Sequence, residues 1–319
     1  MDTEAAPSFQ KSQQETKELI TEISKVFLGK EDVIRNAILA LISGGHVLLE
    51  DVPGLGKTLL AKSIARAVSA DFKRIQFTAD LLPSDISGVT VYSQDSGQFS
   101  FRKGPVFTNI LLGDEINRAT PRTQSSLLEA MEEKSVTVDG ENHQLEEPFF
   151  VLATQNPVEL EGTYPLPFAQ MDRFITRLSI GYLKRDDEIQ VLMTQRSGQS
   201  LENIQSVMTC HDLRAIQKDV RSIRIEESLC GYIVDIVRAT REEDSLEFGA
   251  SPRGSLDLQR FSQAIALIEG RDYVLPDDVK SAARHVLPHR LIARKGTRSV
   301  SLNTNEVIDH IIDSVEVPV

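Results

Sequence analysis

Residues Val47 to Leu60 read Val-Leu-Leu-Glu-Asp-Val-Pro-Gly-Leu-Gly-Lys-Thr-Leu-Leu. The apolar start predicts a buried strand, and the apolar periodicity after the glycines predicts a helix that continues to about Val68. A strand, a glycine-containing loop and a helix in this order are the context of a phosphate-binding P-loop, whose backbone N–H groups and helix N-terminus bind phosphate oxygens. The alternative is an ordinary glycine turn between a strand and a helix. The pattern favours a nucleotide site formed by Pro53, Gly54, Leu55, Gly56, Lys57, Thr58 and Leu59.

Two side chains of this loop have expected roles in nucleotide binding. Lys57 is expected to reach the β- and γ-phosphates of ATP, and the Thr58 hydroxyl is expected to bind Mg²⁺. The P-loop pattern G-x-x-x-x-G-K-[ST] begins with a glycine, but this sequence has Asp51 at that position. Aspartate adopts turn and left-handed backbone conformations more readily than most other residues, so we expect the loop to form in spite of this departure.

The composition is that of a globular protein with a sizeable core. The 319 residues are 40% hydrophobic and 26% charged, which is enough chain for two domains or one large domain. With 35 Lys and Arg residues against 47 Asp and Glu residues, the formal net charge is −12. Proteins that bind duplex DNA usually have a basic binding domain, so nucleic acid is not an expected partner.

The sequence also bears on where the protein is located. It has no run of 18 apolar residues, so no membrane insertion is predicted. Residues 1–14 are polar and include Asp2 and Glu4, unlike a secretory signal, and we expect them to form a flexible N-terminus. The two cysteines, Cys210 and Cys230, are too few for a disulfide framework. The expected location is the cytoplasm.

A second strand-like segment ends in two acidic residues. Ile110-Leu-Leu-Gly is followed directly by Asp114 and Glu115. Acids in this position can simply occupy a surface turn. Together with a P-loop, however, they predict a Walker B element, in which Asp114 holds Mg²⁺, usually through water, and Glu115 orients and polarises the attacking water.

A third buried strand, predicted from Phe149 to Ala153, leads into Thr154-Gln-Asn-Pro. Polar residues at the carboxyl ends of strands lie at the crevice where ligands of open α/β sheets bind. Asn156 is therefore a candidate to hold the γ-phosphate or the attacking water. The alternative is that Asn156 caps a turn before Pro157.

Two hairpins are predicted between these strands. Residues 89–101 form the first, with Val89, Val91, Phe99 and Phe101 on one face and residues 93–97 as its turn. It is either an edge hairpin of the sheet or an insertion that protrudes and contacts a partner. Residues 135–145 form the second, with a turn at Asp139-Gly140.

The pattern changes near Leu183 from alternating strands and helices to helices with few strands. The predicted helices beyond this point cover residues 186–196, 211–220, 226–241, 252–269, 276–287 and 304–314. We therefore predict an α/β domain over residues 15–183 and an all-α domain over residues 184–319.

Eight short motifs follow one another along the chain: His46-Val-Leu-Leu-Glu-Asp-Val-Pro-Gly-Leu-Gly-Lys-Thr, Asp80-Leu-Leu-Pro-Ser-Asp-Ile-Ser-Gly, Gly104-Pro-Val-Phe, Gly113-Asp-Glu-Ile-Asn-Arg-Ala, Leu127-Leu-Glu-Ala-Met-Glu-Glu, Ala153-Thr-Gln-Asn-Pro, Gln170-Met-Asp-Arg-Phe and Ala250-Ser-Pro-Arg-Gly. In this order they resemble the MoxR-type AAA+ ATPases, the helix-2-insert relatives of the magnesium-chelatase ATPase subunit. The resemblance covers about residues 29–290. It implies the α/β fold of a P-loop NTPase (AAA+), with a parallel sheet flanked by helices as its core (15–183) and a smaller all-α lid (184–319). It also implies a homo-oligomeric ring, commonly a hexamer, with ATP at the subunit interfaces.

The resemblance further implies roles for single residues. Asn156 matches the residue called sensor 1, and Arg173 matches the arginine finger, which reaches the γ-phosphate of the neighbouring subunit. Arg253 matches sensor 2 of the lid, and whether it acts on its own or on a neighbouring site stays open. Arg118 is the alternative arginine finger. Gly29-Lys30-Glu31 resembles the segment that, in this family, runs past the adenine of the bound nucleotide.

The two hairpins match family features as well. The one at 89–101 resembles the insertion in helix 2, and the one at 135–145 resembles the hairpin before sensor 1. The expected function is ATP hydrolysis coupled to the remodelling or maturation of a protein client, with a von Willebrand factor A domain protein as a possible partner by analogy. One alternative is a nucleotide-switched binding module, which would not need the base Glu115. Another is a DNA-associated motor, which the net charge of −12 disfavours.

Overall fold

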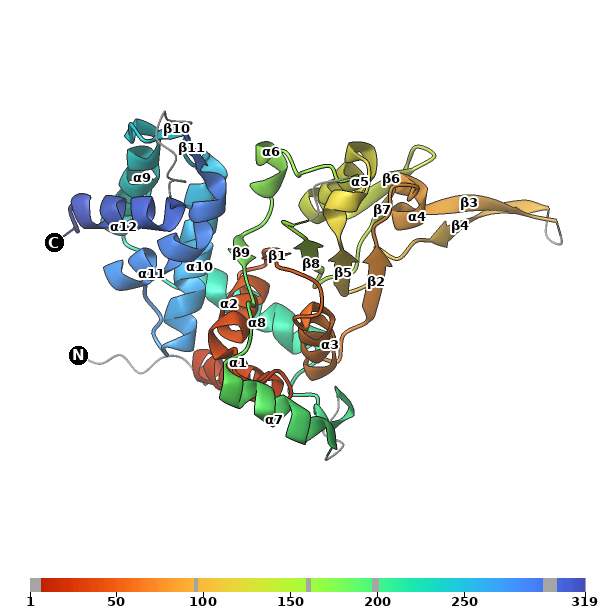
Figure 1. Cartoon of the computed structure of the whole chain (residues 1–319), viewed down its shortest axis with the longest axis horizontal. Helices are drawn as coiled ribbons and strands as arrows, with labels where there is room; N and C mark the ends of the chain where they lie inside the picture. The colour runs from red at the N-terminus through yellow and green to blue at the C-terminus, as the bar shows by residue number, and fades with distance from the viewer. Residues whose placement is uncertain (1–6, 95–96, 159–161, 197–200, 295–302, 319) are drawn as a thin grey trace.

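The structure is a computed structural model that describes residues 7–94, 97–158, 162–196, 201–294 and 303–318. An α/β core and a group of mainly helical elements lie side by side, and a hairpin extends from the core on the side away from these helices (Figure 1). This arrangement confirms the predicted fold class.

A five-stranded parallel sheet forms the centre of the core, with the strand order β2-β5-β8-β1-β9. Its strands are β1 (Val47–Glu50), β2 (Phe72–Gln76), β5 (Ile110–Asp114), β8 (Phe150–Gln155) and β9 (Thr176–Leu178). In the register, Leu48 of β1 lies between Ala153 of β8 and Arg177 of β9. Because the strands are parallel, their carboxyl ends share one edge of the sheet, and the segments that follow β1, β5 and β8 meet there.

The side chains of the strands alternate between two hydrophobic clusters, one on each face of the sheet. Val47 and Leu49 are buried in one cluster with residues of α1 (Pro7–Ser24), α2 (Glu31–Ile42) and α3 (Lys57–Ala67). Leu48 is buried in the other cluster with residues of α4 (Pro83–Ser87) and α5 (Pro121–Glu133). Since successive side chains of a strand point to opposite faces, helices on both faces explain why β1 is apolar throughout its first three residues.

The prediction of a flexible segment over residues 1–14 is wrong from Pro7 onward, because α1 begins there. Residues 1–6 lie outside the described residues. Ser12 is buried, and its hydroxyl donates to Asp219 Oδ2 at 2.7 Å. The helix therefore docks through a polar contact to a distant residue, which is why the polar composition of this segment was misleading.

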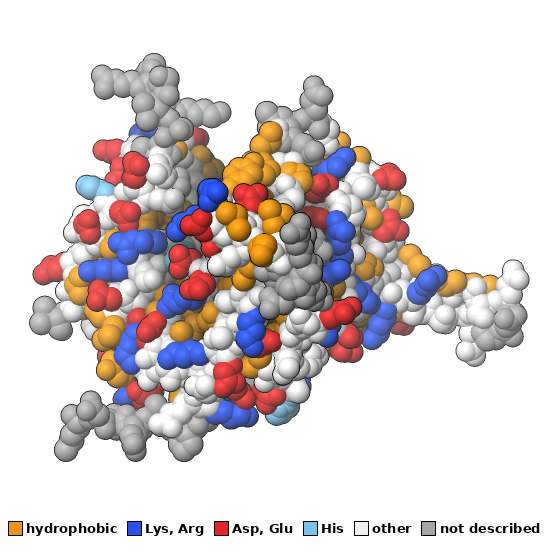
Figure 2. Space-filling model, turned by 60° about the horizontal axis from the view of Figure 1, so that its bottom comes forward, with side chains coloured by type: hydrophobic (Ala, Val, Ile, Leu, Met, Phe, Trp, Pro, Cys, Tyr) orange, Lys and Arg blue, Asp and Glu red, His pale blue; other side chains and the backbone are white. Residues whose placement is uncertain are grey.

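The first predicted hairpin is present and consists of β3 (Gly88–Ser93) and β4 (Gln98–Lys103). It extends from the body of the molecule as an arm (Figures 1 and 2). The predicted common face is wrong: Val91 lies opposite Ser100 and Tyr92 lies opposite Phe99, so the valines and the phenylalanines occupy different faces. The register follows from the pairing of Ser93 with Gln98 at the turn, and residues 95–96 of the predicted turn lie outside the described residues.

The second hairpin, β6 (Ser135–Val138) and β7 (Glu141–Gln144), confirms the predicted turn. Asp139 and Gly140 both have positive φ, 51° and 85°, as the tight turn of a two-residue hairpin requires. The ring of His143 stacks on Phe101 of β4 with a centroid separation of 4.0 Å. The two hairpins therefore contact each other next to the core.

The chain after Leu183 is mainly helical, as predicted. Its helices are α7 (Arg185–Arg196), α8 (Cys210–Ser222), α9 (Glu227–Glu242), α10 (Pro252–Ile268), α11 (Pro276–Val286) and α12 (Thr304–Ser314). A short antiparallel pair, β10 (Leu246–Phe248) and β11 (Ile292–Ala293), accompanies them. Two short helices, η2 (Leu201–Asn203) and η3 (Pro288–Arg290), also lie in this part of the chain. The two short helices of the core are η1 (Ile116–Arg118) and α6 (Phe168–Met171).

The helical part packs directly on the core. Helix α10 contacts α1, α2 and α8 as well as α9 and α11, and all of them contribute to one continuous hydrophobic cluster. Helix α8 contacts α1 and α2 in addition to α10. A domain boundary at Leu183 therefore stays a prediction, because α8 is shared between the two parts. Among the described residues, no helix is both long and apolar enough to cross a membrane.

Candidate functional site

The loop between β1 and α3 has the backbone conformation of a P-loop. Gly54 and Gly56 both have positive φ, 89° and 92°, which favours glycine at each position. A Cβ atom at Gly56 would lie 3.0 Å from the ring of Phe27, whereas one at Gly54 would meet no atom within 4 Å. The loop is therefore supported from behind by Phe27 and is open on the side of Gly54. Lys57 and Thr58 begin α3, directly after the loop.

Asp51, which stands where the P-loop pattern has its first glycine, joins the loop to the chain that follows β9. The residue is buried, and its carboxylate accepts hydrogen bonds from Ser179 Oγ at 2.8 Å, Ile180 N at 2.5 Å and Gly181 N at 3.2 Å. Its φ is not positive. The loop thus forms as expected, but not because aspartate tolerates a left-handed conformation. The carboxylate holds the adjacent segment in place.

Lys57 is buried at the start of α3, and its ammonium group donates to the backbone carbonyl of Asp51. Burial lowers the pKa of Lys57, while the neighbouring carboxylates of Asp51, Asp114 and Glu115 oppose this effect. The acids that sequence reasoning assigned to the same site therefore lie close enough to Lys57 to act on its charge.

Asp114, the last residue of β5, and Glu115, which follows it, are held by polar side chains of neighbouring strands. Asp114 Oδ1 accepts from Thr154 Oγ1 at 2.6 Å, and Asp114 Oδ2 accepts from Arg74 Nη2 at 2.6 Å. Glu115 has a positive φ of 58°; its carboxylate accepts from Gln76 Nε2 at 2.8 Å, and its backbone N–H donates to Thr154 Oγ1 at 2.8 Å. Sequence reasoning missed these three supporting residues. The alternation of Arg74 and Gln76 along β2, which places both on one face, was the available signal.

Asn156 follows β8 at the same edge of the sheet and is buried. Its Oδ1 accepts from the N–H of Val158 at 3.1 Å, and its carbonyl accepts from Asn117 Nδ2 at 3.2 Å. The structure therefore contains the turn-capping role that was the alternative reading of this residue. The position at the carboxyl end of β8 is also the one expected of sensor 1, so that role stays a prediction.

Arg173 and Arg253 lie together, but at the opposite edge of the sheet from the P-loop. Arg173 precedes β9, whose first residue pairs with Val47 at the start of β1. Arg173 Nε lies 3.1 Å from Glu132 Oε2, and Arg253, at the start of α10, hydrogen-bonds to Glu132 Oε1. These residues line a cavity of about 470 Å³ with Gly44 and Gly45, which precede β1. The cavity therefore belongs to the amino edge of the sheet.

Arg290 holds the two arginine-bearing segments against each other. Its side chain is fully buried; Nε donates to Asp172 Oδ1 at 2.7 Å, and Nη2 donates to Asp257 Oδ2 at 2.6 Å and to the carbonyl of Phe174 at 2.8 Å. Asp172 and Phe174 flank Arg173, and Asp257 lies one turn after Arg253 in α10. Burial raises the pKa of Asp257, and the charge of Arg290 opposes this rise. Sequence reasoning did not identify Arg290; a single arginine in the apolar run from Val286 to Ile292 was its only signal.

Arg118, the alternative arginine finger, lies at the P-loop edge. Its Nη1 is 3.0 Å from Glu115 Oε2, three residues earlier in the chain. Arg118 and Arg173 are thus on opposite edges of the same sheet.

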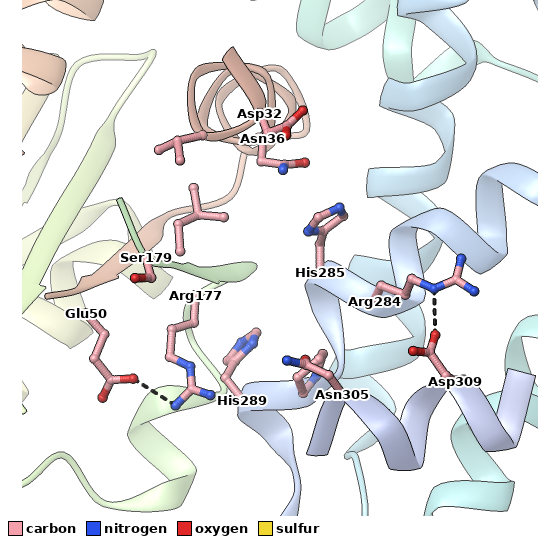
Figure 3. A pocket seen from close by; sticks show the side chains of 13 residues that line it. Asp32, Asn36, Glu50, Arg177, Ser179, Arg284, His285, His289, Asn305 and Asp309 are labelled. Carbon is pink, nitrogen blue, oxygen red and sulfur yellow. Dashed lines mark hydrogen bonds and ion pairs between the residues drawn. The ribbon is translucent and has the colours of Figure 1, made fainter. Parts of the chain in front are cut away.

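A second crevice, of about 500 Å³, separates the carboxyl end of β1 from the lid helices (Figure 3). Arg177 and Glu50 form an ion pair at 3.1 Å on the core side, and Arg284 and Asp309 form one at 2.7 Å on the lid side. The buried His289 donates from Nε2 to the carbonyl of Phe174 at 2.9 Å, and its Nδ1 has no hydrogen-bond partner among the described residues. The crevice therefore borders the P-loop strand on the lid side.

A parallel sheet of this order, with a P-loop after β1 and two acids at the carboxyl end of β5, defines a P-loop NTPase of the AAA+ class. Residues 46–176 match the "ATPase family associated with various cellular activities (AAA)", and residues 238–311 match the "AAA lid domain". The chain is 48% identical to YeaC of Bacillus subtilis over 94% of both chains. It is 39% identical to the protein named chaperone MoxR1 of Mycobacterium tuberculosis, over 94% of this chain and 81% of that protein.

A crystal structure of a protein from Cytophaga hutchinsonii, described as a candidate ATPase, shares 40% sequence identity with this chain. It superimposes with a TM-score of 0.90 and covers 98% of this chain and 97% of its own. The chain belongs to the MoxR family of AAA+ ATPases. Membership implies nucleotide binding with a divalent metal and an oligomeric assembly.

Proposed function

We propose that this chain hydrolyses ATP at sites shared between neighbouring subunits of a ring, commonly a hexamer in this family. The observation that carries the proposal is the separation of two halves of the machinery. Lys57, Asp114 and Glu115 lie at the carboxyl edge of the sheet, whereas Arg173 and Arg253 lie at its amino edge. The four residues of β1 alone span roughly 10 Å, so the arginines of one subunit are too far from its own P-loop to contact a phosphate bound there. The amino edge of a neighbouring subunit can supply them instead.

The carboxyl edge provides the groups that bind the nucleotide. Pro53 begins the loop, residues 54–59 supply backbone N–H groups and the N-terminus of α3 for the phosphates, and Lys57 supplies a positive charge. Thr58 and Asp114 offer a hydroxyl and a carboxylate oxygen, the donor types that Mg²⁺ prefers. When bound there, Mg²⁺ neutralises charge on the β- and γ-phosphates.

Glu115 is the proposed base. Its carboxylate is oriented by Gln76, and its backbone is fixed by the hydroxyl of Thr154. From this position Glu115 accepts a proton from the attacking water, and Asn156 is proposed to orient the same water. A carboxylate placed by two separate strands favours hydrolysis over a nucleotide switch, which has no use for a base.

Arg173 is the proposed arginine finger, and Arg253 acts beside it on the same neighbouring nucleotide. Arg118 is less suitable because it lies at the carboxyl edge, beside Glu115 of its own site, and not at the amino edge that a neighbouring subunit would supply. An arginine finger contributes ~10³–10⁵ to the turnover rate, so turnover is expected to depend on assembly.

Two variants test the assignment at the carboxyl edge. Glu115→Gln should abolish ATP turnover and retain nucleotide binding, whereas Lys57→Ala should weaken binding itself; Glu129→Gln, an exposed residue of α5, is the control. Normal turnover by Glu115→Gln would remove Glu115 as the base. Turnover that rises severalfold with added duplex DNA would favour the DNA-motor alternative.

The proposed use of this turnover is the remodelling or maturation of a protein client, since a relative is named a chaperone. A von Willebrand factor A domain protein is the proposed partner by analogy with the family. Glu115→Gln subunits with ATP should retain a client that Lys57→Ala subunits release. Equal recovery with both variants would argue against nucleotide-dependent client binding.

A further inference from the structure

Glu132, near the end of α5, is the meeting point of two arginines from different parts of the chain. Arg173 comes from the core, just before β9, and Arg253 comes from the first turn of α10. Each oxygen of the Glu132 carboxylate forms an ion pair with one of them: Oε2 with Arg173 and Oε1 with Arg253. Two guanidinium groups repel each other, so a shared carboxylate allows them to converge.

The Nη groups of Arg173, through which a guanidinium binds phosphate, form no hydrogen bond with Glu132 in the described part of the chain. The ion pair between Glu132 and Arg173 is through Nε, at 3.1 Å. A guanidinium binds phosphate best through two parallel N–H groups. Arg173 can therefore keep its contact with Glu132 while its two Nη groups bind an anion.

The backbones behind both arginines are already fixed. Arg290 contacts Asp172 and Asp257, and Ser251 Oγ donates to the other oxygen of Asp172 at 2.7 Å. Arg290 and Ser251 thus hold the backbone, and Glu132 holds the guanidinium groups of the two arginines. The side chains of Glu132, Arg173 and Arg253 are each about one third exposed, and ion pairs between such side chains contribute little to stability. A role in orientation explains the arrangement better than a role in stability.

The charge around this site favours an anion as its ligand. Five cationic residues and only two carboxylates line the cavity: Lys134, Arg173, Arg221, Arg253 and Arg260, against Glu132 and Asp257. Asp257 is itself bound to Arg290, and Lys134 is bound to Glu147, so four arginines remain against Glu132. The cavity therefore keeps an excess of positive charge even with Glu132 ionised.

We propose that Glu132 is a positioning residue for ATP hydrolysis: it orients Arg173 and Arg253 together toward the phosphates of the nucleotide bound by the neighbouring subunit. This inference rests on the proposed function, in which these arginines act across the interface. Glu132 touches neither the nucleotide nor the attacking water, and its effect passes through the two arginines.

The test measures kcat and KM for ATP in assembled rings of Glu132→Gln, Glu132→Asp and Glu133→Gln. Glu133 is the next residue of α5 and is exposed, so its variant is a matched control. We expect Glu132→Gln to lower kcat by roughly tenfold at unchanged KM, because the arginines keep their charge but lose their orientation. Glu132→Asp should recover part of kcat, and Glu133→Gln should equal the unmodified protein. If Glu132 had only a structural role, Glu132→Gln would lower assembly or thermal stability and would not lower kcat selectively at an unchanged KM.

Arg173→Ala, measured alongside, separates the two claims. If Arg173→Ala keeps full turnover, the proposed arginine finger fails and the inference about Glu132 fails with it. If Arg173→Ala loses turnover while Glu132→Gln matches or exceeds the Glu133→Gln control, only the inference about Glu132 is overturned. If both lose turnover, the double variant Arg173→Ala with Glu132→Gln should lose less than the product of the two single losses, because part of the Glu132 effect passes through Arg173. A full multiplicative loss would contradict a role of Glu132 that passes through Arg173.

Discussion

Nε of the buried Arg290 donates to Asp172 Oδ1 at 2.7 Å, and Asp172 directly precedes Arg173. The same guanidinium donates to Asp257 in α10, the helix whose first turn contains Arg253. One lid residue thus joins the core segment that carries the proposed arginine finger to the helix that carries the proposed sensor 2. A movement of the lid would be passed directly to both arginines.

Replacement of Arg290 by Met should be strongly destabilising. It leaves the carboxylates of Asp172 and Asp257 without their buried cation, and loss of one partner from such a network costs roughly 3–5 kcal/mol. Urea unfolding measures the loss. Arg284→Met, which breaks the half-exposed pair with Asp309, should change stability by no more than about 1 kcal/mol. Equal effects of the two variants would contradict the importance given to burial.

Thr154→Val should lower turnover through the two acids. The Thr154 hydroxyl donates to Asp114 and accepts from the Glu115 N–H, so its loss removes a hydrogen bond from each of the two acids at the end of β5. We expect a loss of roughly 1–3 kcal/mol in unfolding free energy together with a lower kcat. Thr240→Val is the matched control, because the buried Thr240 hydroxyl also donates one hydrogen bond and accepts another, both with backbone groups, but lies in the lid helix α9. A similar kcat for both variants would show that Thr154 affects stability alone.

Asp51→Gly should weaken nucleotide binding although it restores the P-loop pattern. The change removes the acceptor of Ser179, Ile180 and Gly181 and gains nothing, since φ at this position is not positive. Asp51→Ala should lose as much affinity for Mg²⁺–ATP, measured by titration. Asp244→Ala, at an exposed position of the lid, is the control. Tighter binding by Asp51→Gly would contradict the role assigned to the carboxylate.

Stability should fall in mild acid because of His46. Burial lowers the pKa of His46 to about 4; its Nδ1 accepts from the Val151 N–H, and its Nε2 faces the Met131 carbonyl. The unfolded chain takes up this proton near pH 6.5, so it binds more protons than the folded chain between pH 6.5 and 4. This contribution is fully present above pH 6.5 and is lost as the pH falls toward 4, by about 3 kcal/mol for a shift of this size.

Unfolding free energies measured from pH 7 to pH 4.5 test this dependence. His46→Gln should flatten the curve, and His310→Gln, at an exposed position, should leave it unchanged. The buried His289, whose pKa also lies well below its usual value because of burial, should preserve part of the slope. An unaltered slope in His46→Gln would contradict the assignment.

The sequence allowed the local features of the site to be predicted, because they depend on short patterns. The apolar run before Pro53 and the two acids after Gly113 were enough to place the P-loop and the acidic edge. The support for these features comes from residues far away in the chain. Asp51 reaches residue 179, Thr154 reaches residue 114, and Glu132 joins residues 173 and 253.

Two wrong predictions have different physical origins. The β3–β4 register depends on which residues pair at the turn, and alternation alone does not distinguish registers that differ by one residue. The first turns of α1 are polar because Ser12 docks on Asp219, so their hydrophobicity gave no sign of order.

One catalytic site is proposed to be built by two subunits, and mixing two inactive variants in equal amounts tests this most directly. Glu115→Gln subunits keep an intact Arg173, and Arg173→Ala subunits keep an intact P-loop and Glu115. In random mixed rings, about one quarter of the head-to-tail interfaces would combine the two intact halves, so turnover should rise well above that of either variant alone. A mixture that assembles but turns over no faster than its separate components would contradict a site shared between subunits.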